Sequence, residues 1–130
     1  MIVDPSALMA ILLSEPEEAQ FLEALHAAEQ CSLAAGSWVE IAAVLTRSRR
    51  VQAFAALHIL MHEAEIEVEP TSATQAQIAH EAYRTYGMGT GHPARLKFGD
   101  CFAYALSRES GRPLLFKGDD FRHTDVESAV

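Results

Sequence analysis

The sequence has few cysteines, and they are not arranged for zinc or redox chemistry. Cys31 and Cys101 are the only two, they lie far apart, and neither belongs to a Cys-x-x-Cys pair. Zinc-ribbon and thioredoxin-type sites are therefore excluded. Each cysteine lies among apolar residues, so we expect both to be small, buried core residues.

Long apolar runs are also missing. No uninterrupted stretch approaches the ~18 residues that a membrane-spanning helix needs. The first residues, Met-Ile-Val-Asp-Pro, lack the basic region of a signal peptide. We therefore expect a cytoplasmic protein that does not act at a membrane.

Several common catalytic motifs do not occur. The sequence has no Gly-x-x-x-x-Gly-Lys-Ser/Thr, no Gly-x-Ser-x-Gly and no His-Glu-x-x-His. His58 and His62 are four residues apart on a predicted helix and could in principle bind a metal. No third ligand is evident nearby, so a solvated or partly packed pair is the preferred interpretation.

Positive charge is scarce. The net charge of -8 argues against a protein that coats nucleic acid nonspecifically. Local basic clusters remain at Arg47, Arg49 and Arg50 and at Arg95 and Lys97. Either cluster could form a local basic patch, although a solvated charged face explains the 47–50 cluster equally well.

What the sequence does contain is an alternation of strand and helix patterns over 130 residues. This alternation predicts one α/β domain over residues 1–130, with a central parallel sheet flanked by helices on both faces. Capping boxes are predicted at 14–17 and 37–40. The helix that the second one opens would bury Val39, Ala43 and Val44, and could also bury Ile41. The predicted strands are 1–4, 31–34, 66–69, 114–116 and a short last one at 125–126. The predicted helices cover 6–13, a segment after 17, a segment from 37, 51–65, 73–86 and 100–110.

Acidic residues recur where predicted strands end or helices begin. Asp4 follows the first strand, Glu40 lies early in the helix after the second, Asp100 opens a helix, and Asp119 and Asp120 follow the strand at 114–116. Ligands of open parallel sheets bind beyond the carboxyl ends of the strands, so we expect these acids to meet there. Taken singly, each has a local explanation as a cap, a capping-box member or a turn residue.

A cluster of carboxylates needs a cation, because like charges at short range otherwise force protonation. Oxygen ligands of this kind suit Mg²⁺ or Mn²⁺. A divalent ion can polarise a phosphate and lower the pKa of water. The acids therefore indicate metal-assisted phosphodiester hydrolysis.

Three segments resemble the PIN-domain ribonucleases, and specifically the VapC toxins of VapBC toxin–antitoxin pairs. The start, Val-Asp4-Pro-Ser6-Ala, resembles the family's Val-Asp-x-Ser-Ala, and Ser-Trp-Val-Glu40 resembles its Ser-x-x-Glu. The third segment, the most specific, runs from His-Pro-Ala-Arg-Leu-Lys-Phe-Gly-Asp100 through Leu-Leu-Phe-Lys-Gly-Asp-Asp-Phe121. Together they cover nearly the whole chain.

The resemblance implies a Mg²⁺- or Mn²⁺-dependent endoribonuclease that cleaves structured RNA such as tRNA. It implies that Asp4 and Asp100 bind the metal and that Glu40 helps to hold or activate the attacking water. Ser6 matches a small hydroxyl residue beside the first aspartate. The fourth acid is Asp119 or Asp120, with Asp119 slightly preferred.

Two positions depart from the family pattern. Lys97 stands where the subgroup usually has asparagine, and Gly118 stands where many PIN domains have an aspartate. Lys97 could pair with a carboxylate, contact phosphate or impair activity. An impaired PIN-fold binding module inside a repressor complex is therefore the alternative function. A DNA nuclease or a haloacid-dehalogenase-type phosphatase is a weaker alternative, and Ser6 counts against the phosphatase because that family needs an acid there.

The family also implies partners. These are an RNA substrate, contacted by candidates Arg95, Lys97 and Lys117, and a VapB-type antitoxin that lays an amphipathic segment into a groove. Segments 6–13 and 51–61 are candidates for that groove, although ordinary core packing explains them at least as well. A homodimer or a toxin–antitoxin hetero-oligomer is expected.

Overall fold

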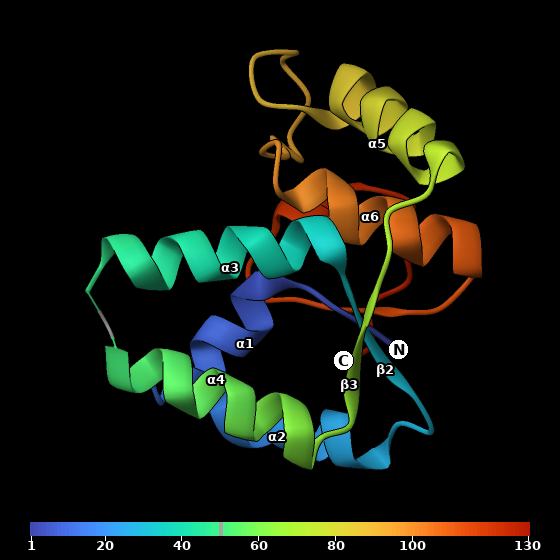
Figure 1. The fold of residues 1–130 in the computed structure, drawn as a ribbon. Helices are drawn as coiled ribbons and strands as arrows, with labels where there is room; N and C mark the ends of the chain where they lie inside the picture. The colour runs from blue at the N-terminus through green and yellow to red at the C-terminus, as the bar shows by residue number, and fades with distance from the viewer. Residues whose placement is uncertain (50) are drawn as a thin grey trace.

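A four-stranded parallel sheet organises the chain. The computed structural model describes residues 1–49 and 51–130, so Arg50 of the basic cluster lies outside the described residues. The strand order is β3-β2-β1-β4, and all neighbours are parallel (Figure 1). The strands are β1 (Ile2–Val3), β2 (Cys31–Ala34), β3 (Ile66–Glu69) and β4 (Leu114–Leu115). The predicted α/β class with a parallel sheet is confirmed.

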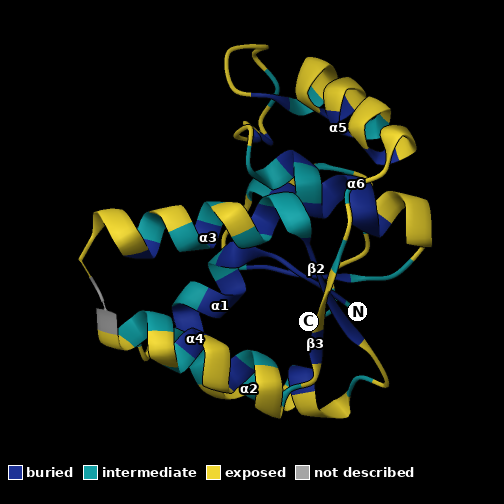
Figure 2. Cartoon of the chain, in the orientation of Figure 1, coloured by how far each residue is buried: buried dark blue, intermediate teal, exposed yellow. Residues whose placement is uncertain are grey.

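Helices cover both faces of this sheet because alternate strand residues point to opposite sides. Val3, Leu33 and Leu115 pack into one core with α1, α2, α3 and α4, whereas Ile2, Ala34 and Leu114 pack into a second core with α5 and α6. Figure 2 shows buried residues along β1, β2 and the inward helix faces, whereas the edge strand β3 is largely exposed. The helices are α1 (Pro5–Leu12), α2 (Glu18–Ala27), α3 (Ala35–Arg47), α4 (Val51–Glu63), α5 (Ala73–Tyr86) and α6 (Asp100–Ser110), followed by the 3-10 helix η1 (Asp120–His123).

Both predicted capping boxes are wrong. Helix α3 begins at Ala35, so Ser37 is already inside the helix, fully buried, with no hydrogen-bond partner for its hydroxyl. The buried face of α3 consists of Ser37, Ile41 and Leu45, so of the residues expected to be buried Ile41 is buried, whereas Val39 is 68% exposed. Ser14 lies in a turn with a φ of 50° and caps nothing.

The predicted strand at 125–126 is also absent. The chain instead bends after η1 and returns to β4 through a single bridge between Leu114 and Ser128. Both cysteines are buried and unpaired, as expected.

Of the two segments suggested for an antitoxin groove, 6–13 is largely core, whereas only Leu57 and Leu60 are buried among the described side chains of 51–61. In α1, Pro5, Ala7, Leu8, Ala10 and Ile11 are buried. In α4, Phe54 and Met61 are partly buried and pack against the core, whereas Ile59 is 59% exposed. No helix among the described residues is both long and apolar enough to cross a membrane.

Candidate active site

Asp4 occupies the point where β1 passes into α1. Its side chain is the N-cap of α1 and accepts the backbone N–H of Ser6 at 2.9 Å and the Ser6 hydroxyl at 2.5 Å, both through Oδ2. Pro5 suits the first helical position because it has no N–H to satisfy. The other oxygen, Oδ1, is buried without a partner, and the residue is only 3% exposed. Asp4 therefore caps α1 through Oδ2 and leaves Oδ1 without a hydrogen-bond partner.

Burial raises the pKa of Asp4 to about 7. The two hydrogen bonds from Ser6 oppose that shift, and the charges of Asp100 and Glu40 add to it. The carboxyl group is thus poised between its two protonation states near neutral pH.

Ser6 connects the ends of two strands. Its hydroxyl donates to Asp4 and accepts the backbone N–H of Lys117, just beyond β4, at 3.0 Å. The backbone N–H of Asp4 in turn donates to Leu115 of β4 at 2.9 Å. Ser6 therefore holds the first acid in position.

Glu40 points into the site from the second turn of α3. Its Oε2 is buried without a hydrogen-bond partner. Burial and the charge of Asp100 raise the pKa of Glu40, and the charge of Lys97 partly offsets them. The carboxylate lies directly against the α-carbon of Gly99, where a β-carbon would collide with Oε1 and Oε2. Gly99 thus makes room for the second acid, a role that the loop composition did not predict.

Asp100 is the first residue of α6, which runs back across the sheet before β4. A helix that leads into a parallel strand begins at the carboxyl edge, so Asp100 lies there with Asp4. Its Oδ2 accepts the backbone N–H of Lys97 at 2.6 Å. Burial raises the pKa of Asp100, the bond from Lys97 and its charge lower it, and the charge of Asp120 raises it.

Two neighbouring acids, Asp119 and Asp120, follow β4, and their surroundings differ. Asp119 is 85% exposed at its side chain and faces Arg122, with 3.8 Å between Oδ1 and Nε. Asp120 is partly buried and is the acid whose charge acts on Asp100. The geometry thus favours Asp120 over the slightly preferred Asp119 as a member of the acidic site.

The acids fit a divalent cation in their chemistry. Asp4 Oδ1 and Glu40 Oε2 are buried and unpartnered, and the pKa values of Asp4, Glu40 and Asp100 are all raised. A cation would relieve both costs at once. Among residues 1–49 and 51–130, no three such side chains already stand in a geometry that would hold an ion by themselves.

The basic candidates lie in different settings. Lys97 is exposed, and its charge lowers the pKa values of Glu40 and Asp100, so it lies beside the acids. Arg95 is exposed two residues earlier. The ammonium of Lys117 is 2.8 Å from Glu15 and 2.9 Å from Glu17. Arg47 ends α3, away from the turn that carries Glu40.

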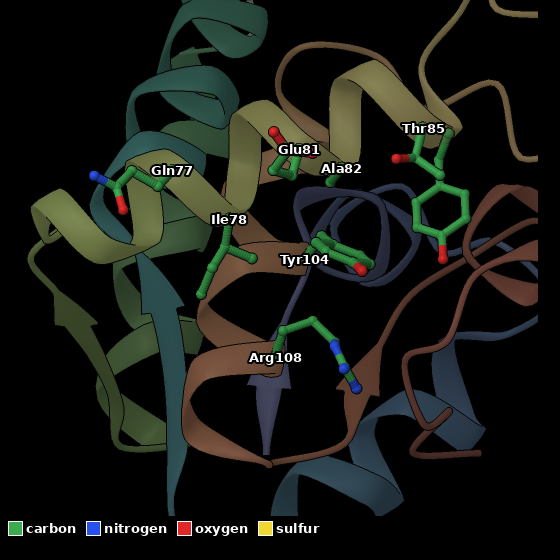
Figure 3. Close-up of a pocket in the computed structure, with 8 residues that line it drawn as sticks. Gln77, Ile78, Glu81, Ala82, Thr85, Tyr104 and Arg108 are labelled. Carbon is green, nitrogen blue, oxygen red and sulfur yellow. The ribbon is translucent and has the colours of Figure 1, made fainter.

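A separate hollow of about 420 Å³ lies between α5 and α6 (Figure 3). It is lined by Tyr104 and Arg108 from α6 and by a row from α5 that includes Ile78 and Glu81. The Tyr104 hydroxyl donates to Asp125 at 2.7 Å. None of the acids described above lines this hollow, so it is not part of the acidic site.

Comparisons with known proteins place the chain in a family. Residues 1–127 match the PIN domain. The chain is 46% identical over 130 residues to ribonuclease VapC28 of Mycobacterium tuberculosis, covering 100% of this chain and 98% of that one. It is 43% identical over 129 residues to ribonuclease VapC42 of the same species, covering 99% and 98%.

Two solved structures share the fold at 18% identity. The sarcin–ricin-loop-cleaving toxin VapC20 of M. tuberculosis superposes with a TM-score of 0.73, covering 96% of this chain and 95% of that one. A toxin–antitoxin complex from Klebsiella pneumoniae gives 0.66, covering 92% and 88%. With the acids gathered at the carboxyl edge of a parallel sheet and full-length relatives above 40% identity, the chain belongs to the PIN-domain family and, within it, to the VapC ribonucleases.

Proposed function

We propose that this chain is the toxin of a toxin–antitoxin pair and a divalent-metal-dependent endoribonuclease. The observation that carries the proposal is the meeting of buried, unpartnered carboxylate oxygens from α3 and from the start of α1 beside Asp100 of α6. VapC28, VapC42 and VapC20 carry ribonuclease or RNA-cleaving names, which supports RNA as the substrate. Residues 1–130 would act as one domain, in the cytoplasm.

The residues of the site divide the work. Asp4 and Asp100 would hold a Mg²⁺ or Mn²⁺ ion, which when bound neutralises the acids and polarises the scissile phosphate. Glu40 would hold the attacking water and accept its proton, since its Oε2 is unpartnered and its pKa is raised. Ser6 keeps Asp4 in place through Oδ2, which leaves Oδ1 for the ion.

Asp120 would complete the site as the fourth acid, in preference to Asp119. The test is a matched pair of variants, Asp120→Asn and Asp119→Asn, assayed for cleavage. We expect the first to lose activity and the second to retain it, because the charge of Asp120 acts on Asp100, whereas Asp119 is exposed and faces Arg122. Equal loss in both would contradict this assignment.

The substrate would be structured RNA such as tRNA, cut in single-stranded loops where the backbone is accessible. Lys97, beside the acids, and Arg95, exposed two residues earlier, would contact phosphates. Lys117 would contribute less, since Glu15 and Glu17 already engage its ammonium. A VapB-type antitoxin would be the protein partner, in a hetero-oligomer or beside a toxin homodimer, and the Klebsiella complex supports such an assembly.

The experiment is cleavage of total tRNA by purified protein with Mg²⁺, with Mn²⁺ and with chelator, beside Asp100→Asn. Discrete fragments that vanish with chelator and with the variant are expected. Fragments that persist in Asp100→Asn would place the activity elsewhere or in a contaminant. Absence of cleavage with either metal, together with retained antitoxin binding, would support the alternative, an inactive PIN-fold binding module, which the departures Lys97 and Gly118 motivate.

A further inference from the structure

We propose that Phe98 is a stacking platform for one unpaired RNA base next to the scissile phosphate. This inference rests on the proposed ribonuclease function and adds a residue that selects single-stranded substrate. It starts from an aromatic ring that is 72% exposed beside the acids. Single exposed apolar residues are common on protein surfaces, so exposure alone does not indicate a binding site.

The exposed ring of Phe98 packs against one aromatic neighbour. Phe98 and Phe102 lie edge to face, with centroids 5.2 Å apart and an interplanar angle of 87°. In this geometry a ring meets its neighbour with one edge or one face only. At least one face of Phe98 is therefore open to solvent and available to a flat ligand.

Phe102, the ring against which Phe98 packs, is itself packed against a second helix. The ring of Phe102 rests on the α-carbon of Gly36, in the first turn of α3, where a β-carbon would collide with three ring carbons. Phe102 thus joins α6 to α3 in the same way that Gly99 and Glu40 do one turn away. An aromatic ring fixed before binding loses little conformational entropy when a base stacks on it.

The backbone around Phe98 is tied to both acids. The N–H of Lys97, just before it, donates to the carboxylate of Asp100, and Gly99, just after it, lies against Glu40. The exposed ammonium of Lys97 adds a positive charge beside the ring. Figure 2 shows the segment that leads into α6 as largely exposed. A nucleotide whose base stacks on Phe98 would therefore bring its phosphate towards Lys97 and the acids.

Stacking also matches the expected substrate. Every base has a π-face, so an aromatic platform accepts unpaired bases with little sequence preference and rejects bases held in a duplex. Loop cleavage would then follow from Phe98, whereas the acids themselves act only on the phosphate. An antitoxin segment covering Phe98 is the competing occupant, and the test separates it from RNA.

The test compares Phe98→Leu with Phe98→Trp on a short single-stranded oligoribonucleotide that spans the loop cleaved by the wild-type protein. Leucine keeps apolar area but has no π-face, and tryptophan keeps the face. We expect Phe98→Leu to raise KM by roughly 5- to 100-fold with kcat little changed, and Phe98→Trp to restore KM. Ile59→Leu, an exposed apolar change on α4, is the matched control and should leave KM unchanged.

A second arm removes the base instead of the ring. Oligoribonucleotides with one abasic position, moved along the strand, should show a single position near the cut that costs the wild-type protein the same factor. An abasic residue at that position should not raise the KM of Phe98→Leu any further, because the two changes remove the same interaction. Additive losses would overturn the proposal even if one of the variants folded poorly.

The outcomes distinguish this inference from the function on which it rests. If the wild-type protein cleaves RNA and Phe98→Leu has the same KM, the ribonuclease stands and the platform is refuted. If Phe98→Leu loses binding to the antitoxin while its KM for RNA is unchanged, the surface serves the protein partner and the platform is again refuted. If the wild-type protein cleaves no RNA with either metal, both proposals fail.

Discussion

Replacing Asp4 with asparagine should stabilise the metal-free protein above neutral pH. Burial raises the pKa of Asp4 from 3.8 to about 7 in the folded state. The folded state therefore holds this proton more tightly than the unfolded chain. The free energy of unfolding should consequently fall as pH rises from about 4 to about 7, and the loss should be complete above that range.

The size of the effect follows from the same values. At about 1.4 kcal/mol for each pKa unit, the shift corresponds to about 4 kcal/mol of lost stability once Asp4 is ionised. Asp4→Asn removes that loss and still accepts both bonds from Ser6 through its amide oxygen. It also places an unpartnered NH₂ where Oδ1 was, at a cost of about 1–3 kcal/mol. The net gain at about pH 8 is therefore about 1–3 kcal/mol.

The assay is urea unfolding in chelator between about pH 5 and pH 8, with Asp119→Asn as the control for the same change at an exposed carboxylate. The unfolding free energy of the wild-type protein should fall across this range relative to Asp4→Asn, and Asp119→Asn should follow the wild type. Adding Mg²⁺ at about pH 8 should stabilise the wild type more than Asp4→Asn, because the ion binds the ionised carboxylate. Parallel curves for the wild type and Asp4→Asn, or an equal response to Mg²⁺, would refute the reasoning.

Three further variants test the surroundings of the acids. Gly99→Ala should push the Glu40 carboxylate out of place and lower kcat/KM for RNA by about 100-fold, while leaving thermal unfolding close to that of the wild type. Ser6→Ala leaves the N–H of Lys117 without its acceptor and removes one hydrogen bond to Asp4, so urea unfolding should show a loss of about 1–2 kcal/mol in stability. The pKa of Asp4 should also rise further, because that bond lowers it, and the acid limb of the pH–rate profile should then move to higher pH. When the RNA-binding constant is measured against salt concentration, Lys97→Gln should reduce the slope of log K against log salt by about one, and Lys117→Gln should leave it unchanged. The reverse result would show that Lys117, and not Lys97, contacts phosphate.

The local patterns of the sequence predicted most of the fold. The segments at 31–34, 66–69, 73–86 and 100–110 are found with the predicted bounds. Their signals are local, namely alternation, helical periodicity and a closing glycine or proline, so they survive in the tertiary structure. The capping boxes failed for the opposite reason. Ser-x-x-Glu at 37–40 is compatible with a helix start, but α3 begins at Ala35, so Ser37 is buried inside the helix and Glu40 lies close enough to Asp100 to feel its charge.

In the candidate site too, some features followed from the sequence and others did not. That Asp4, Glu40 and Asp100 would converge followed from topology, because parallel strands place their carboxyl ends at one edge. The choice between Asp119 and Asp120 did not follow from topology, because neighbouring residues in a turn point in different directions. The contribution of Gly99 was also missed, because a loop glycine carries no signal for the side chain that fills the space beside it.

By itself the sequence determined the order of strands and helices, the parallel sheet and the edge at which the acids gather. These depend on residue periodicity and on the alternation of strand and helix patterns, which can be read from the sequence segment by segment. Only the tertiary structure decided which carboxylate oxygens are buried without a partner, which lysine is already paired, and which aromatic ring stays open beside the acids. Those outcomes depend on residues far apart in the chain coming into contact, and burial then sets the pKa values and charges from which the proposed chemistry follows.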